Sequence, residues 1–248
     1  MLQLNHITFA ADDPTRLAGF WAELLRYETE ATEKDCVAGG DGPELLFKGM
    51  PKSPTIELPI HLDVNAPDRE AEVQRALELG ARLVATKTQE VGELGETWTV
   101  MRDPEGNGFC LQGPDPRKTH PYIGNVTFSS AAPTRLGAFW SQALGWSEQE
   151  TPEGFLEMLL EAGLDRTELE AYYATMNPDG SRLRFLFQRR EKSRPDHYPI
   201  HLDFTSDDRE GEIDRLASAG ATVSETKTAG DRTWTVLRDP EGNSFCVE

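Results

Sequence analysis

The chain contains the same stretch of sequence twice. Residues 98–110 read WTVMRDPEGNGFC and residues 234–246 read WTVLRDPEGNSFC, so eleven of thirteen positions are identical. Two further pairs recur in the same order: NHITFAADDPTRLAGFW at 5–21 with GNVTFSSAAPTRLGAFW at 124–140, and PIHLDV at 59–64 with PIHLDF at 199–204. Insertions fall between these stretches, as expected where the stretches are structural elements and the gaps are loops. The pattern predicts a tandem duplication.

A chain of 248 residues divides readily into two repeats, each long enough to bury a core of its own. We therefore expect a first domain over residues 1–113 and a second domain over residues 122–248. The segment 114–121 between them is polar and rich in proline, which is typical of a short interdomain linker.

The charge of the chain restricts its partners. Lys and Arg total 25 against 43 Asp and Glu, a formal net charge of −18. A surface this acidic repels phosphate backbones and anionic lipid heads, so neither nucleic acid nor a membrane is an expected partner. The start of the chain lacks the basic and apolar regions of a secretory signal, which predicts a cytoplasmic protein. The three cysteines form no C-x-x-C pair, and we expect reduced thiols without a disulfide.

The first half of each repeat has the pattern of a strand followed by a helix. Residues 4–10 alternate as a strand does, and Pro14 behind Asp13 is a favourable helix start. Apolar residues then recur at helical spacing, which places both tryptophans of the stripe in the core. The stripe comprises Leu17, Phe20, Trp21, Leu24 and Leu25 in the first repeat and Leu136, Phe139, Trp140, Ala143 and Leu144 in the second. Strand-like runs follow at 44–48 and 183–188.

The second half of the repeat has the same order of elements. After the IHLD strand, we expect a helix over 68–79 ending at Gly80, and strands over 81–86, 97–102 and 108–112. The last two strands are joined by DPEGN, in which Gly106 and Asn107 tolerate the positive φ of a tight turn. Each repeat thus reads as two βαβββ modules, and the chain as four.

Paired βαβββ modules with an NHITF start, an IHLD strand and a DPEGN-x-FC ending resemble the vicinal oxygen chelate superfamily. Within it, the chain resembles the glyoxalase-like or bleomycin-resistance type of domain, present twice. The resemblance implies an α+β fold in which the modules form cup-shaped half-barrel sheets. It also implies metal ligands that project into each cup from the first strand, the strand opening the next module and the closing strand. Whether a cup forms within one repeat, across both repeats or between two chains is left open.

The alternation of side chains along the strands tests these ligand positions independently. Ile7 and Phe9 share one face of their strand, so His6 and Thr8 share the other. The same alternation places His61, Asp63 and Cys110 opposite their apolar neighbours. By resemblance, the metal ligands are then His6, His61 and Cys110, and Asp63 is a candidate for moving a proton. The remaining candidates are pocket residues: Thr8, Asp63, Asn125, Thr127, His201, Asp203 and Cys246.

Cys110 and Cys246 depart from the family pattern, because the metalloenzymes of the family usually have a glutamate at this position of the closing strand. Two imidazoles and a thiolate suit Zn²⁺ and are poor ligands for Mg²⁺ or Ca²⁺. Asn125 stands where the first repeat has His6, which makes the first repeat the better metal candidate. The alternative is that both cysteines are small buried hydrophobic residues and that no metal is bound.

Three functions follow from the resemblance, and the sequence leaves open whether the chain is an enzyme. The first is a metal-dependent lyase or isomerase of the glyoxalase type, which stabilises an oxyanion or enolate of a small organic molecule. The second is a metal-free protein that binds a small molecule or drug, as bleomycin-resistance proteins do. The third is an extradiol-type dioxygenase, which a thiol beside iron and oxygen disfavours. No nucleotide-binding pattern is present, and the chain is expected to be a monomer or a homodimer.

Overall fold

The computed structural model describes residues 1–32, 34–50, 60–91, 94–113, 118–149, 172–176, 183–190 and 199–248. The elements of these residues, in chain order, are β1 (Gln3–Ala11), α1 (Pro14–Leu25), β2 (Glu28–Ala31), β3 (Asp35–Gly40), β4 (Gly42–Gly49), β5 (Ile60–Asn65), α2 (Arg69–Glu78), β6 (Arg82–Val91), β7 (Leu94–Arg102), β8 (Gly108–Gln112), β9 (Tyr122–Ser130), α3 (Pro133–Leu144), β10 (Ser147–Glu148), β11 (Tyr172–Met176), β12 (Arg184–Arg189), β13 (Ile200–Thr205), α6 (Arg209–Ser218), β14 (Thr222–Ala229), β15 (Arg232–Arg238) and β16 (Ser244–Val247). Of the predicted linker 114–121, residues 114–117 lie outside the described part.

The four predicted βαβββ modules are confirmed. They run from β1 to β4, from β5 to β8, from β9 to β12 and from β13 to β16, with one helix after the first strand of each. In every module the first and last strands pair in parallel. The fold is therefore α+β, as the sequence predicted.

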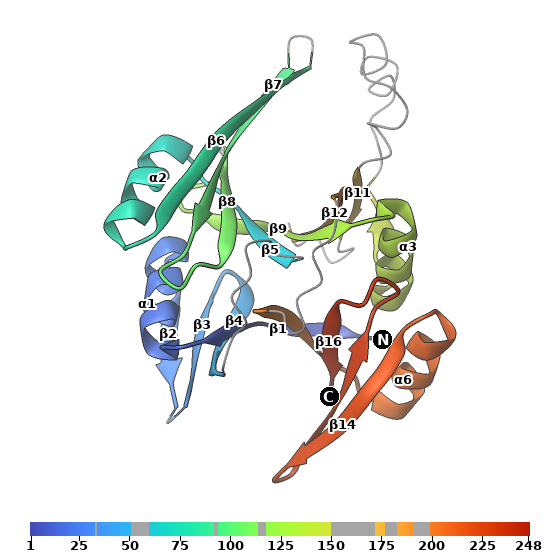
Figure 1. Ribbon diagram of the computed structural model, residues 1–248. Coiled ribbons are helices and arrows are strands. Elements are labelled where there is room, and N and C mark those ends of the chain that lie inside the picture. The colour runs from blue at the N-terminus through green and yellow to red at the C-terminus, as the bar shows by residue number, and fades with distance from the viewer. Residues whose placement is uncertain are drawn as a thin grey trace.

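The strands form two eight-stranded sheets, neither closed into a barrel, and each sheet combines modules from both repeats. We call them the β1 sheet, ordered β14-β15-β16-β13-β1-β4-β3-β2, and the β5 sheet, ordered β10-β11-β12-β9-β5-β8-β7-β6. The junctions are the antiparallel pairs of β1 with β13 and of β5 with β9. The first module thus pairs with the fourth, and the second with the third, so each sheet forms across the two repeats (Figure 1).

The helices lie in pairs, α1 with α2 and α3 with α6, at opposite sides of the molecule (Figure 1). The stripe of α1 is buried as predicted, and its centre is Trp21, which has no exposed surface. The Trp21 ring lies 5.5 Å from that of Phe9 in the β1 sheet and 5.2 Å from that of Phe109 in the β5 sheet. Trp140 of α3 repeats this arrangement between Phe128 and Phe245. Each helix tryptophan therefore joins the two sheets within one repeat.

The repeated DPEGN turn is held together by its aspartate. Asp103 Oδ1 accepts the backbone N–H groups of Glu105 and Asn107, and Oδ2 accepts the Asn107 amide at 2.8 Å and the Trp21 indole N–H at 3.3 Å. Gly106 has the expected positive φ of 90°. Asn107 does not, because its role is to bond the aspartate side chain across the turn.

The glutamate of the same turn fastens one module to the next. Glu105 accepts the backbone N–H groups of Asp12 and Asp13, immediately before α1, at 2.9 and 2.8 Å. Glu241 does the same for Ala131 and Ala132 before α3. These carboxylates satisfy N–H groups at the entrance to a helix, where negative charge is favourable.

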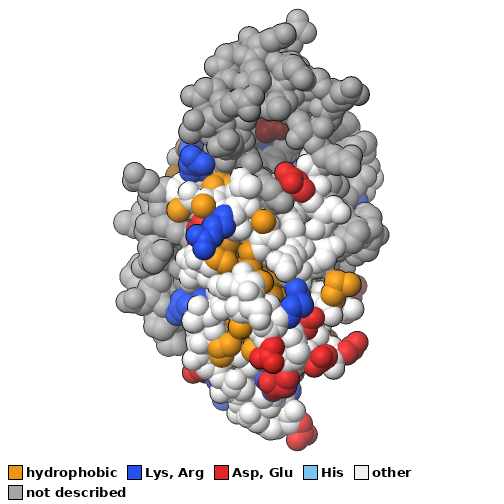
Figure 2. All heavy atoms as spheres, turned by 90° about the vertical axis from the view of Figure 1, so that its right-hand side faces the viewer, with side chains coloured by type: hydrophobic (Ala, Val, Ile, Leu, Met, Phe, Trp, Pro, Cys, Tyr) orange, Lys and Arg blue, Asp and Glu red, His pale blue; other side chains and the backbone are white. Residues whose placement is uncertain are grey.

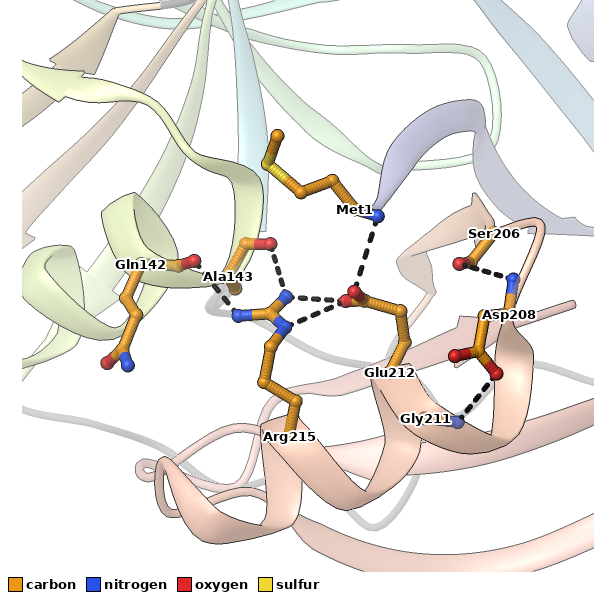
Figure 3. Close-up of polar contacts among 8 residues, drawn as sticks. All are labelled: Met1, Gln142, Ala143, Ser206, Asp208, Gly211, Glu212 and Arg215. Carbon is orange, nitrogen blue, oxygen red and sulfur yellow. Dashed lines mark hydrogen bonds and ion pairs between the residues drawn. The ribbon is translucent and has the colours of Figure 1, made fainter.

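An arginine holds the other end of each helix pair. In the second repeat, Arg215 of α6 pairs with Glu212 and donates to the backbone carbonyls of Gln142 and Ala143 at the end of α3 (Figure 3). Glu212 also lies 3.3 Å from the amino group of Met1. In the first repeat, Arg75 makes the corresponding contacts with the end of α1.

The surface over α3 and α6 carries acidic side chains mainly on its lower half, with hydrophobic side chains in a narrow band through the middle (Figure 2). No helix among the described residues is long and apolar enough to cross a membrane. Cys36, Cys110 and Cys246 are free thiols.

Candidate functional site

Each sheet has one face packed against helices and an opposite face, which we call the helix-free face. In β1, Ile7 and Phe9 are fully buried toward the helix side, and Thr8 points to the helix-free face. The helix-free faces are polar but little exposed, because Thr8, Asp63 and Thr127 have at most 1% of their surface accessible. Buried polar groups require hydrogen-bond partners, and the partners here are one another.

Asp63 is the centre of a polar cluster on the β5 sheet. Its Oδ2 accepts hydrogen bonds from Asn125 Nδ2 at 3.0 Å and Thr127 Oγ1 at 2.7 Å. Its Oδ1 lies 3.4 Å from His61 Nε2. Cys110 is next to Asp63 in register, and the ligand atoms of His61, Asp63 and Cys110 all lie within 4.8 Å of one another.

Asp203 is the centre of the corresponding cluster on the β1 sheet. Its Oδ2 accepts a hydrogen bond from Thr8 Oγ1 at 2.5 Å, and its Oδ1 lies 3.2 Å from His201 Nε2. Cys246 is next to Asp203 in register, and the ligand atoms of His201, Asp203 and Cys246 also lie within 4.8 Å of one another. The two sheets thus carry the same His, Asp and Cys arrangement.

The β1 sheet adds a second imidazole and a second carboxylate to its cluster. His6 lies beside Asp203 in register on one side and beside Glu44 on the other. The distance from His6 Nε2 to Glu44 Oε2 is 3.3 Å, and the Glu44 side chain is 54% exposed while that of His6 is 18% exposed. Five side chains able to ligate a metal therefore share this face.

The β5 sheet has different residues at the two added positions. Asn125 lies beside Asp63 in register, where the β1 sheet has His6, and Arg184 lies beside Asn125, where the β1 sheet has Glu44. Arg184 Nε donates to Asn125 Oδ1 at 2.9 Å, and Arg184 Nη1 donates to Gln149 Oε1 at 2.8 Å. An amide and a guanidinium thus replace an imidazole and a carboxylate.

Both central aspartates are held in the ionised form. Burial opposes ionisation of Asp203, but the hydrogen bond and charge of His201 and the hydrogen bond from Thr8 outweigh it, and the pKa of Asp203 is lowered to about 2. Burial also opposes ionisation of Asp63, and the contacts with His61, Asn125 and Thr127 outweigh it, so the pKa of Asp63 is likewise lowered.

Both cysteines are held as neutral thiols. Burial, followed by the charge of Asp203, raises the pKa of Cys246 to about 12. Burial and the charge of Asp63 raise the pKa of Cys110 well above its usual range. Neither thiol is therefore a free nucleophile at neutral pH, because the thiolate is the reactive form.

Because the pKa of Asp203 is lowered, the free energy of unfolding depends on pH in the acidic range. Its folded pKa of about 2 is below the unfolded value of about 3.9, so its contribution is complete above about pH 5 and is lost as the pH falls toward 2. We expect Asp203→Asn to remove about 2 kcal/mol from the difference in unfolding free energy between pH 5 and pH 2. Urea denaturation of the metal-free protein at a series of pH values measures this difference. Asp207→Asn, a change at an exposed carboxylate, is the control and should keep the wild-type pH dependence.

The structure distributes the sequence-predicted metal residues over two sheets. His61 and Cys110 lie together on the β5 sheet, with the predicted pocket residues Asp63, Asn125 and Thr127. His6 lies on the β1 sheet, with the predicted pocket residues Thr8, His201, Asp203 and Cys246. The separation arises because β1 pairs with β13 of the second repeat, whereas β5 of its own repeat pairs with β9 in the other sheet.

Three residues on these faces, Arg184, Trp98 and Val100, were not predicted from the sequence to lie at a site. Arg184 follows a long insertion in the second repeat, and no sequence pattern marks it as facing Asn125. Trp98 and Val100 share the face of Cys110, because Val100 is beside Cys110 in register and Trp98 is two residues away. The alternation of WTV in the repeated stretch could have indicated this face for Trp98.

The family model for the glyoxalase-like domain matches the chain twice, at residues 6–112 and 125–248. The chain belongs to the glyoxalase-like family. The predicted membership of the vicinal oxygen chelate superfamily is thereby confirmed. No curated protein matches this glyoxalase-like chain by sequence.

Solved structures with the same fold include glyoxalase I from Zea mays, at 14% identity and a TM-score of 0.64, with 100% of this chain and 92% of that chain covered. A protein from Bacillus subtilis subsp. subtilis str. 168, provisionally named a dioxygenase, matches at 15% identity and a TM-score of 0.61, with 98% and 84% covered. Both similarities extend over all four modules of the glyoxalase-like chain. At these identities they establish the fold and leave the activity to be argued from the site.

Proposed function

We propose that this glyoxalase-like protein binds one divalent cation of the zinc type on the helix-free face of the β1 sheet and acts there on a small organic molecule. The observation that carries the proposal is that the ligand atoms of His201, Asp203 and Cys246 lie within 4.8 Å of one another, with His6 and Glu44 on the same face beside them in register. The proposal keeps His6 as a ligand and replaces His61 and Cys110 by their counterparts His201 and Cys246.

The chemistry of these side chains fits Zn²⁺. Imidazole nitrogen and thiolate sulfur are its usual ligands, and three protein ligands leave a fourth position for substrate. The Cys246 thiol is neutral without a cation, with a pKa raised to about 12. A coordinated cation reverses this preference, so binding would release a proton and strengthen with rising pH.

The carboxylates have separate roles in this proposal. Asp203 lies 3.2 Å from His201, so it would orient the imidazole, as carboxylates do for metal-bound histidines. With a pKa of about 2, Asp203 is a weak base at neutral pH. The pKa of Asp63 is also lowered, which makes Asp63 a poor candidate for the proton transfer that the sequence suggested for it. Glu44, partly exposed and adjacent to His6, is the better candidate for moving a proton.

The proposed reaction class is that of a lyase or isomerase acting on a molecule with two neighbouring oxygen atoms. A bound Zn²⁺ would supply Lewis acidity that stabilises an oxyanion or enolate. The chain would hold the substrate, exclude water and exchange a proton at Glu44.

Metal analysis tests the proposal. Purified protein is stripped with a chelator, dialysed against Zn²⁺ and analysed for bound metal. We expect a single Zn²⁺ per chain, lost in His201→Ala and retained in His61→Ala, which is the matched change on the β5 sheet. The absence of bound Zn²⁺ in the wild-type protein, or equal loss in both variants, would contradict the proposal.

Metal-free binding of a small molecule or drug is the second candidate. It is favoured because both central aspartates already have partners. Thr8 and His201 contact Asp203. Asn125, Thr127 and His61 contact Asp63. A thermal-shift screen with small dicarbonyl compounds and cationic glycopeptide antibiotics separates the candidates. Stabilisation that requires Zn²⁺ supports the enzyme, whereas stabilisation by a drug in chelator supports the binding protein.

A further inference from the structure

We infer that the helix-free face of the β5 sheet is a second, metal-free site that binds a small organic carboxylate, with Arg184 as the anchor. The inference goes beyond the proposed function and does not depend on the cation of the β1 sheet. It rests on three features of the described residues: a positioned guanidinium, unbalanced positive charge and an aromatic side chain on the same face.

Arg184 is positioned before any ligand arrives. Its Nε bonds Asn125 Oδ1 at 2.9 Å and its Nη1 bonds Gln149 Oε1 at 2.8 Å, and the side chain is half-buried. Both partners are neutral amides, so the positive charge of Arg184 is not cancelled by them. No hydrogen bond from Nη2 is found within the part of the chain that the structure describes. A guanidinium held in this way binds a carboxylate with little loss of side-chain freedom.

Two further cations, Arg190 and Lys87, act electrostatically on Cys110. Arg190 donates to the neutral amide of Gln188 at 2.9 Å. Asp63, the carboxylate at the centre of this face, already accepts hydrogen bonds from Asn125 and Thr127. The chain as a whole has a net charge of −18, which repels anions. This cluster of cations is a local region of positive charge, and it favours the binding of an anion there.

The β1 sheet has cations of its own near Cys246, namely Lys48 and Lys227, but it is less positive at the positions equivalent to Arg184, Arg190 and Lys87. Glu44 replaces Arg184 beside the equivalent residues His6 and Asn125. Met50 replaces Arg190, because Met50 follows β4 and bonds the end of β1 as Arg190 follows β12 and bonds the end of β9. Lys227 corresponds to Lys87, but its amino group is paired with Glu225 at 2.7 Å. The residue two before Lys87 is Ala85, which offers no charge. Lys48, whose counterpart is Gln188, adds positive charge to the β1 face, but the three differences together still make the β5 face the more positive one.

Trp98 supplies an apolar surface beside the cations. It lies next to Lys87 in register on β6 and two residues from Val100, which is beside Cys110. Its indole is half-buried, in contrast to the buried tryptophans of the helices. A half-exposed indole favours a flat apolar group, so an aromatic carboxylate satisfies both the ring and the guanidinium.

Calorimetric titration with benzoate tests the inference, using full-length protein in chelator. Benzoate is expected to bind with an affinity that falls as salt is raised, and benzylamine, which has the opposite charge, is expected not to bind. Arg184→Gln should weaken benzoate binding by about 10-fold to 100-fold, because a charged hydrogen bond is removed. Arg184→Lys, which keeps the charge and loses the planar fork, should fall between the two.

Glu44→Gln is the matched control on the β1 sheet and should bind benzoate as the wild-type protein does. The melting temperature of each variant in chelator shows whether it is folded. Failure of wild-type protein to bind benzoate, equal binding of benzylamine, or unchanged affinity in Arg184→Gln would overturn the inference. Binding of Zn²⁺ without binding of benzoate would contradict this inference alone. Binding of benzoate without binding of Zn²⁺ would contradict the proposed function alone.

Discussion

Trp21→Ala is expected to lower the free energy of unfolding by about 3–5 kcal/mol, which is a large share of the stability of a typical domain. The indole is fully buried and contacts Phe9 in one sheet and Phe109 in the other. Its removal leaves a cavity between the sheets. It also deprives the buried Asp103 carboxylate of one hydrogen-bond donor.

Chemical denaturation followed by circular dichroism measures this loss. Trp140→Ala should have a similar effect, because Trp140 has the same place in the second repeat and bonds Asp239 at 3.2 Å. Trp98→Ala is the control and should cost less than about 1.5 kcal/mol, since the Trp98 side chain is half-buried on a helix-free face. Equal losses for Trp21 and Trp98 would contradict the assignment of Trp21 as the contact between the sheets.

Exchange of two residues is expected to remove metal binding from the β1 sheet. The double variant His6→Asn and Glu44→Arg copies the residues of the β5 sheet onto the β1 sheet. It should weaken Zn²⁺ binding at least about 100-fold, because it removes a ligand and places a cation beside the site. Asn125→His with Arg184→Glu makes the reverse exchange, and we expect that protein to bind a second Zn²⁺.

Competition with a zinc indicator measures both affinities. The first double variant leaves the contacts of Asp203 with Thr8 and His201 unchanged, so its melting temperature in chelator should stay close to that of the wild-type protein. The reverse variant replaces the Asn125 donor of Asp63, so its melting temperature in chelator is measured to show that it is folded. A wild-type affinity in the first variant would mean that His6 and Glu44 do not contribute to the site. The absence of a second ion in the reverse variant would mean that the β5 sheet excludes metal for a reason other than these two side chains.

Local patterns in the sequence were sufficient for the elements and for the faces of the strands. Helical spacing predicted the burial of Leu17 and Trp21, and period-two alternation predicted that Ile7 and Phe9 oppose Thr8. These predictions depend on neighbouring residues only, which is why one sequence could support them.

The pairing of modules could not be predicted in the same way. The partner of β1 is β13, almost 200 residues later, and nothing in either strand specifies the other. Strand pairing between modules depends on the packing of the whole chain, and the sequence analysis left it open. The grouping of His6 with His201 instead of His61 follows from this one non-local contact.

The most strongly repeated stretch has mainly a structural role. In DPEGN the aspartate holds the turn and bonds the helix tryptophan, and the glutamate holds the start of the helix in the preceding module. These contacts join the β5 sheet to the β1 sheet through Glu105, and again through Glu241 in the second repeat. Only the tryptophan at the start of the stretch and the cysteine at its end reach a candidate site, and the two copies of the cysteine lie on different sheets.

Titration with Co²⁺ tests the central claim, that the two otherwise similar clusters differ in metal binding. Co²⁺ replaces Zn²⁺ at many sites, and its bond to a thiolate gives a charge-transfer absorption in the near ultraviolet. We expect this absorption to saturate at a single Co²⁺ per chain, to disappear in Cys246→Ser and to be unchanged in Cys110→Ser. An absorption that is lost in Cys110→Ser and kept in Cys246→Ser would contradict the account, as would its absence from the wild-type protein.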